Sequence, residues 1–104
     1  MKEMDIRGFE ARVQEEKPVL VEYSAPWCVY CRRIGPAMEK VADQWEPQVD
    51  VFQVDIDRQP LLAEQEHIEV IPTLVVYRDG KALGSIVAPE SKARIDAFLR
   101  EVLQ

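Results

Sequence analysis

The chain holds only two cysteines, and two residues separate them at the point where an apolar run gives way to a segment with helical spacing. Residues three apart lie on one face of a helix, so Cys28 in a first turn would lie within disulfide distance of Cys31. A first turn also presents unpaired N–H groups and the positive end of the helix dipole, which favour a thiolate at Cys28. The spacing predicts thiol–disulfide chemistry, with Cys28 as an exposed nucleophile and Cys31 as a buried resolving thiol.

The same Cys-x-x-Cys spacing also occurs in half of a zinc site. A structural zinc ion takes four nitrogen or sulfur ligands, whereas this chain offers two cysteines and one distant histidine, His67. An intramolecular zinc site is therefore disfavoured, and a site shared between two copies stays open. The motif inside a βαβ pattern favours redox chemistry instead. We expect no metal and no bound organic cofactor.

A carboxylate precedes the cysteine pair within an apolar run. The segment from Val19 to Ser24 has the length and β-branched content of a central strand covered on both faces. Glu22 inside such a strand would be costly unless it were neutralised or had a use, which makes it a second functional candidate. The alternative is an edge-strand glutamate that points into water, because polar residues alternate along half-exposed strands.

Hydrophobic periodicity predicts strands and helices in alternation along the rest of the chain. The predicted strands cover residues 19–24, 49–55, 73–78 and 81–87, and Asp79-Gly80 forms the hairpin turn between the last two. The predicted helices start at Asp5, at Cys28, near Pro60, and at Pro89 or Ser91. This order predicts an α/β fold.

Three motifs in sequence resemble the thioredoxin family: the run Val19–Cys31, then Ile71-Pro72-Thr73-Leu74, then Arg78-Asp79-Gly80-Lys81. The match spans nearly the whole chain. It implies a thioredoxin fold, with a central mixed β-sheet flanked by helices, over a single domain of residues 1–104. Thioredoxins usually begin with a strand, and only about four residues precede the first predicted helix, so that strand is expected to be short or absent.

The resemblance also assigns roles in the site. Glu22 matches the buried acid beneath the active-site pair and would serve as general base for Cys31. The Ile71–Pro72 bond is expected to be cis and to face the cysteines. The residues that would frame a groove for client proteins are Trp27, Ile71, Pro72 and Ala88.

Two positions depart from the usual thioredoxin pattern. Thioredoxins usually carry Gly-Pro between the cysteines, and this chain carries Val29-Tyr30, which we assign to redox tuning. Proline has no N–H, so Tyr30 adds one donor near the Cys28 sulfur and predicts a less reducing couple. Gln53 stands where the family usually has a lysine paired with the acid, so the pKa of Glu22 is expected to be raised.

Composition narrows the function classes. The net charge is −6 and no cluster of Lys and Arg stands out, which disfavours nucleic acid as a partner. No segment approaches the roughly 20 apolar residues that cross a bilayer, so no membrane association is expected. Residues 1–8 carry charges where a signal peptide has its apolar core, which predicts a cytoplasmic protein.

The predicted function is reduction of disulfides in client proteins by dithiol–disulfide exchange, with a thioredoxin-reductase-type electron donor restoring the dithiol. One alternative is a protein disulfide oxidase or isomerase, which Glu22 and the Val29-Tyr30 pair favour. Another is a non-catalytic thioredoxin-fold adaptor with idle cysteines. The presence of both cysteines together with Trp27 and Pro72 disfavours the adaptor.

Overall fold

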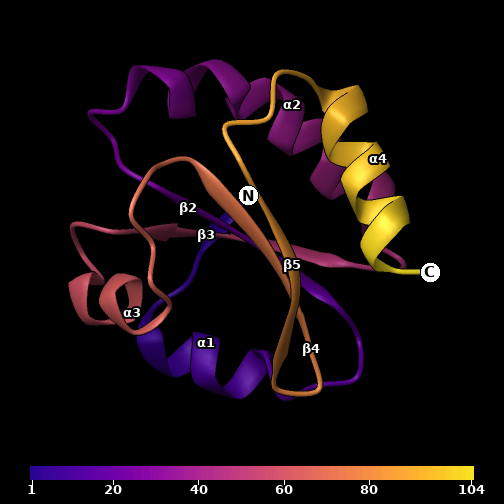
Figure 1. Ribbon diagram of the computed structural model, residues 1–104, viewed down its shortest axis with the longest axis horizontal. Helices are drawn as coiled ribbons and strands as arrows, with labels where there is room; N and C mark the ends of the chain where they lie inside the picture. Colours follow the sequence, from indigo (N-terminus) through magenta and orange to yellow (C-terminus); the bar gives the residue numbers. More distant parts are fainter.

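The predicted strands assemble into one five-stranded sheet. The computed structural model describes all of residues 1–104. Its strands are β1 (Lys2–Glu3), β2 (Val19–Ser24), β3 (Asp50–Asp55), β4 (Thr73–Arg78) and β5 (Lys81–Val87). Its helices are α1 (Ile6–Arg12), α2 (Val29–Trp45), α3 (Pro60–Gln65) and α4 (Lys92–Val102). The sheet has the order β1-β3-β2-β4-β5 (Figure 1).

The sheet is mixed, as predicted. Strands β1, β3 and β2 run parallel to one another, whereas β4 runs antiparallel to both β2 and β5. Strand β2 is central, and all six of its residues are buried. The first strand has two residues and pairs with β3, which confirms the prediction of a short first strand.

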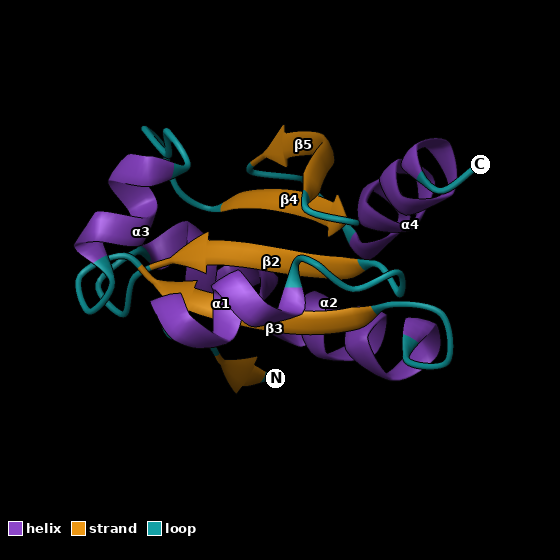
Figure 2. Ribbon diagram, turned by 90° about the horizontal axis from the view of Figure 1, so that it is seen from below, coloured by secondary structure: helices purple, strands orange, loops and turns teal.

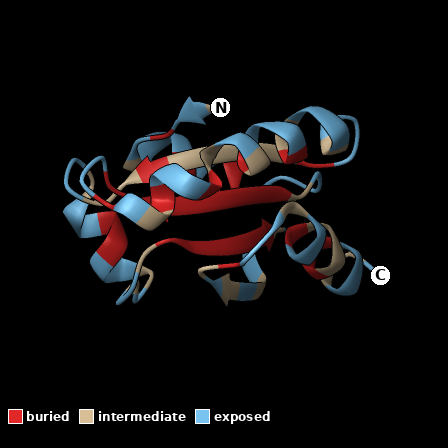
Figure 3. Cartoon of the chain, turned by 90° about the horizontal axis from the view of Figure 1, so that it is seen from above, coloured by how far each residue is buried: buried red, intermediate tan, exposed pale blue.

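Helices cover both faces of the sheet. Figure 1 shows α2 and α4 above the sheet and α1 and α3 below it, and Figure 2 shows the strands between these layers. We call the buried apolar cluster beneath α2 and α4 the upper core: Leu20, Ile34, Met38, Val41, Val49, Leu74, Val76, Ile95, Phe98 and Leu99. We call the cluster above α1 and α3 the lower core: Met4, Phe9, Val13, Val19, Val21, Tyr23, Val54, Leu62, Val75 and Tyr77. Figure 3 shows this burial concentrated on the central strands, with exposed residues on the outer faces of the helices.

Alternation along β2 decides which side chain enters which core. Successive side chains of a strand point to opposite faces. Val21 and Tyr23 belong to the lower core and Leu20 to the upper core. Glu22 is two residues from Leu20, so its carboxylate points to the upper face, under the helix that carries Cys31.

Side-chain caps and turn geometry fix the helix and hairpin ends that the sequence predicted. The Asp5 carboxylate accepts a hydrogen bond from the Gly8 amide, and the Ser91 hydroxyl accepts one from the Arg94 amide. Asp79 and Gly80 have φ angles of 53° and 78°, the left-handed values that a two-residue hairpin needs at both central positions. None of the four helices is both long enough and apolar enough to span a membrane.

Candidate active site

The cysteine pair lies where β2 passes into α2. Cys28 is the N-cap of α2, with extended backbone, and its amide donates to the Ala25 carbonyl at 3.1 Å. The Cys31 amide donates to the Cys28 sulfur at 3.2 Å. This sulfur therefore takes the place of a capping oxygen and satisfies one of the unpaired N–H groups of the first turn. Negative charge on the sulfur is favoured there by both the donor and the helix dipole.

The structure corrects one part of the sequence prediction, because Cys28 is not exposed. Cys28 is 8% exposed and Cys31 is 6% exposed. Both pack with Ala25 in a small cluster that Tyr30, Ile56 and Ile71 cover. Segments distant in sequence supply Ile56 and Ile71, and the local spacing of a Cys-x-x-Cys motif carries no information about them.

The environment of Cys31 keeps this thiol protonated. Burial raises the pKa of Cys31 well above its usual range, and the hydrogen bond with Cys28 raises it further. The negative charge of Glu22 acts in the same direction. The thiol of Cys31 therefore needs a proton acceptor before it can attack a disulfide.

Glu22 lies beneath this pair in the position that the sequence predicted. Its side chain is 1% exposed, and neither carboxylate oxygen has a hydrogen-bond partner. The alternative of an edge-strand glutamate in water is therefore wrong. Burial and, to a smaller extent, the charge of Glu39 together raise the pKa of Glu22 from 4.5 to about 7, which confirms the predicted direction. Near neutral pH this carboxyl can both take up and release a proton.

Gln53 leaves the buried acid without a partner. Gln53 is opposite Glu22 in the β2–β3 ladder, but its amide group donates to the Ser24 hydroxyl at 2.9 Å instead. Ser24 and Gln53 line a hollow of about 300 Å³ that also borders Cys31 and Arg32. Solvent thus has access to the surroundings of Cys31 from the side of β1 and β3.

Trp27 is the most exposed part of the site. Its indole is 64% exposed, and the indole N–H donates to the Asp57 carboxylate at 2.7 Å. Asp57 follows β3, and its own amide donates to the Asp55 carboxylate at 2.9 Å. Sequence reasoning did not find this role for Asp57. The Asp57 carboxylate therefore fixes the Trp27 indole at the surface, next to Cys28 in the chain.

The remaining predicted groove residues come from the loops before β4 and after β5. The Ile71–Pro72 peptide bond is cis, as the resemblance implied, and Ile71 packs against the cysteine cluster. The Pro72 carbonyl accepts a hydrogen bond from the Ala88 amide at 2.8 Å. Ala88 has a φ of 44°, in the left-handed region that favours glycine. The structure thus brings Pro72 and Ala88 into direct contact.

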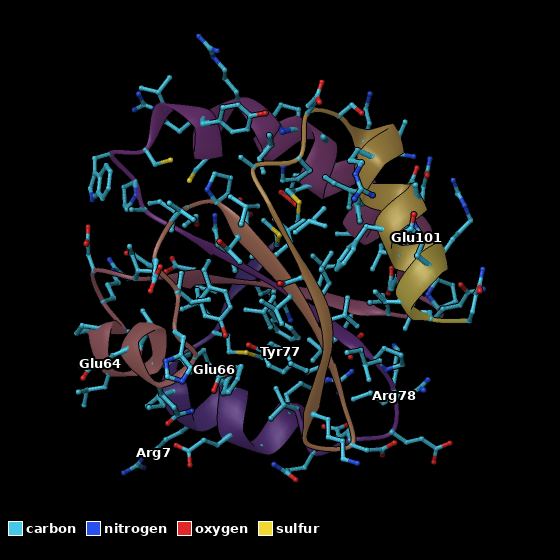
Figure 4. All side chains as sticks on the ribbon, in the orientation of Figure 1. Arg7, Glu64, Glu66, Tyr77, Arg78 and Glu101 are labelled. Carbon is cyan, nitrogen blue, oxygen red and sulfur yellow. The ribbon has the colours of Figure 1, made fainter.

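A second buried polar group lies away from this site. The Tyr23 and Tyr77 hydroxyls are 2.7 Å apart, and Tyr77 donates to the Glu66 carboxylate at 2.9 Å. Figure 4 shows Tyr77 and Glu66 on the side of the sheet that α1 and α3 cover, whereas the cysteines lie at the start of α2. This group links α3 to the sheet and takes no part in the chemistry of the cysteines.

Comparison with known proteins assigns the chain to a family. The model of the family described as Thioredoxin matches residues 1–101. The chain belongs to the thioredoxin family. The activity that accompanies this family and a Trp-Cys-x-x-Cys segment is dithiol–disulfide exchange, so the chain is a protein thiol–disulfide oxidoreductase.

Individual relatives support the same assignment. Thioredoxin 1 of Synechococcus elongatus is 38% identical over 88 residues, which cover 84% of this chain and 82% of that protein. The bifunctional thioredoxin reductase/thioredoxin of Mycobacterium leprae is 30% identical over 99 residues, which cover 95% of this chain and 22% of that protein. A solved structure of Plasmodium falciparum thioredoxin has a TM-score of 0.88 at 23% identity and covers 97% of this chain and 98% of that one, which confirms the thioredoxin fold.

The two residues between the cysteines, Val29 and Tyr30, do not supply the contact to the Cys28 sulfur that the sequence predicted. The donor to the Cys28 sulfur is the amide of Cys31, not the amide of Tyr30. A Gly-Pro pair would keep that donor, so the mechanism first given for a less reducing couple is not the one that the geometry shows. The tuning role of Val29 and Tyr30 stays a prediction. What sequence reasoning missed is the Tyr30 hydroxyl, which reaches the loop after β5.

Proposed function

We propose that this thioredoxin reduces disulfides in client proteins, with Cys28 as nucleophile, Cys31 as resolving thiol and Glu22 as the proton acceptor for Cys31. The observation that carries the proposal is how Cys28, Cys31 and Glu22 are arranged around the start of α2. The Cys28 sulfur caps a helix, Cys31 is buried behind it, and an unpartnered carboxyl with a pKa of about 7 lies beneath both.

The exchange proceeds in two displacements. The Cys28 thiolate attacks one sulfur of the client disulfide, a Cys28–client disulfide forms, and the other client sulfur leaves as a thiolate that takes a proton from water. Glu22 then accepts the Cys31 proton. The Cys31 thiolate attacks the Cys28 sulfur and expels the second client thiolate. Two electrons pass to the client, and a Cys28–Cys31 disulfide remains.

The hollow beside Cys31 supports this proton path. Glu22 has no ammonium partner that would hold it ionised, and Cys31, Ser24 and Gln53 line the hollow, whereas Glu22 does not reach it. We place the return of the proton to water on this side, next to Cys31. The carboxyl is then ready for the next turnover.

The client groove that we propose is framed by Trp27, Ile71, Pro72 and Ala88. Trp27 offers an exposed apolar surface, and the backbone before β4 is the edge to which an extended client segment can add by strand pairing. The exposed Val29 lies beside Cys28 and extends the apolar surface along α2. Clients with an extended, apolar segment next to the disulfide suit this surface.

The dithiol has to be restored by a reductase after each turnover. The Mycobacterium leprae relative carries the name thioredoxin reductase/thioredoxin, and its match supports an electron donor of the thioredoxin-reductase type for this chain as well. Thiols stay reduced in the cytoplasm, where such a donor operates, so the cytoplasm is the compartment that fits the proposed direction.

Reduction of insulin tests the proposal against the adaptor alternative. With dithiothreitol as electron source, the chain is expected to accelerate precipitation of the insulin B chain in proportion to its concentration. The Cys28→Ser variant serves as control and should give the rate of dithiothreitol alone. Equal rates for the wild type and this control would show that the chain has a thioredoxin fold but does not act as a reductase.

A glutathione titration separates the reductase from the oxidase or isomerase. The tuning role predicted for Val29 and Tyr30 implies a couple less reducing than the roughly −270 mV of thioredoxin, and a shift of about 30 mV corresponds to a factor of about 10 in the equilibrium constant. The Val29→Gly/Tyr30→Pro double variant should be more reducing than the wild type. If the two proteins have the same potential, Val29 and Tyr30 do not tune the couple.

A further inference from the structure

The Tyr30 side chain connects two segments that border the proposed groove. Tyr30 lies in the first turn of α2, between the two cysteines. Its hydroxyl donates to two neighbouring carbonyls, that of Pro89 at 3.2 Å and that of Ala88 at 3.3 Å, in a shared hydrogen bond. The ring packs against the upper core as well as the cysteine cluster. Figure 1 shows the segment between β5 and α4 beside the start of α2.

Ala88 is held from two sides in a conformation that alanine disfavours. Its φ of 44° brings Cβ close to the backbone, so the left-handed region is strained for residues other than glycine. The Ala88 amide donates to the Pro72 carbonyl at 2.8 Å, and the Ala88 carbonyl accepts from Tyr30. These hydrogen bonds oppose the strain, so the loop keeps this shape only while its partners are in place.

We propose that the Tyr30 hydroxyl is a latch that fixes Ala88 and thereby sets the shape of the client groove, which makes Tyr30 a positioning and specificity residue. The chain of contacts runs from Tyr30 through Ala88 to Pro72, and so joins the helix of the cysteines to both loops of the groove. The part of this inference that concerns clients rests on the proposed function.

The latch acts through the population of one loop conformation. With alanine at position 88, the strain opposes the hydrogen bonds, so loss of the Tyr30 hydroxyl depopulates the shape that receives clients. With glycine at this position the strain is absent, and the same loss leaves that shape well populated. If only a fraction of the protein molecules has the shape that receives clients, the apparent affinity for clients is reduced by that fraction. The effect of Tyr30 is therefore expected to depend on the residue at position 88.

Tyr30→Phe removes the hydroxyl and keeps the ring and the backbone N–H, so it separates the latch from redox tuning. We expect KM for insulin to rise about twofold with the glutathione redox potential unchanged, because loss of one hydrogen bond shifts the loop equilibrium about fivefold and lowers the receptive fraction from about three quarters to about two fifths. In the Ala88→Gly background the same substitution should leave KM nearly unchanged. Equal rises in both backgrounds, or a changed potential with an unchanged KM, would overturn the proposal.

Hydrogen exchange of the Ala88 amide tests the latch without reference to catalysis. This amide is protected through the Pro72 carbonyl, and Tyr30→Phe should speed its exchange about two- to threefold in the reduced protein, in step with the larger open fraction. Tyr77→Phe is the matched control, because it removes a hydroxyl on the opposite side of the sheet, and exchange of Ala88 by local opening should not change. Unaltered exchange in Tyr30→Phe would refute the latch even if insulin is reduced normally. Faster exchange with an inactive wild type would instead refute the proposed function and leave the latch as a purely structural link.

Discussion

Replacing Cys31 by serine is expected to leave the chain covalently attached to its clients. Cys28 still attacks the client disulfide, but no second sulfur lies behind it to expel the client, so the mixed disulfide persists. Non-reducing electrophoresis of the Cys31→Ser variant with an oxidised client should show a covalent complex, and dithiothreitol should separate it by reducing the mixed disulfide. Steady-state reduction should fall to the uncatalysed rate.

The Cys28→Ser variant is the matched control for this experiment, since it differs from the first variant only in which sulfur remains. The pKa of Cys31 is raised by burial and by its hydrogen bond with Cys28, so this thiol should form no comparable complex. Accumulation of the complex in Cys28→Ser and its absence in Cys31→Ser would reverse the two roles.

Replacing Glu22 by glutamine is expected to change how stability depends on pH. The unfolded carboxyl loses its proton near 4.5, and burial raises the pKa in the folded protein to about 7. Between these values the folded state holds the proton and the unfolded state does not, so the free energy of unfolding falls as pH rises. Above the folded pKa the penalty is constant, at about 3 kcal/mol. The reduced Glu22→Gln variant should gain stability relative to the wild type by up to this amount between about pH 5 and about pH 8.

Urea denaturation of the reduced proteins at the two pH values measures this difference. Glu101→Gln is the matched control, because Glu101 is an exposed glutamate on α4 (Figure 4) and its replacement should leave the pH dependence of the wild type unchanged. If Glu22→Gln and the wild type lose stability in parallel, ionisation of Glu22 is not penalised in the fold.

The same substitution should slow release of the client. Cys31 would lose the acceptor for its proton, and a positioned general base contributes about a hundredfold or more in rate. In rapid mixing with an oxidised client, the mixed disulfide of Glu22→Gln should form at the rate of the wild type and decay about a hundredfold more slowly. Equal decay rates would show that water, not Glu22, accepts this proton.

The sequence predicted those features that depend on local pattern. Strand β2 has the predicted bounds because its run of apolar residues, interrupted only by Glu22, requires cover on both faces. The hairpin at Asp79 and Gly80 follows from turn chemistry that few residue types satisfy. Glu22 was identifiable because a carboxylate inside such a strand contradicts its surroundings unless it has a use.

Features that depend on contacts between distant segments escaped prediction. Cys28 was expected to be exposed, and Ile56 and Ile71 cover it from loops that its own sequence neighbours do not specify. The donor to its sulfur depends on the exact position at which α2 begins. The bond from Tyr30 to Ala88 spans 58 residues, and neither residue type alone indicates it. Tertiary contacts of this kind decide the shape of the groove, whereas the cysteine spacing decides only the chemistry.

The central claim is that Cys28 is the attacking thiol and Cys31 the resolving one, and competitive alkylation tests it directly. The reduced protein is treated near neutral pH with less iodoacetamide than protein, and peptide mass mapping gives the ratio of modification at the two cysteines. Cys28 should carry nearly all of the label, because its sulfur caps the helix while the pKa of Cys31 is raised by burial. Faster labelling of Cys31 than of Cys28 would contradict the account.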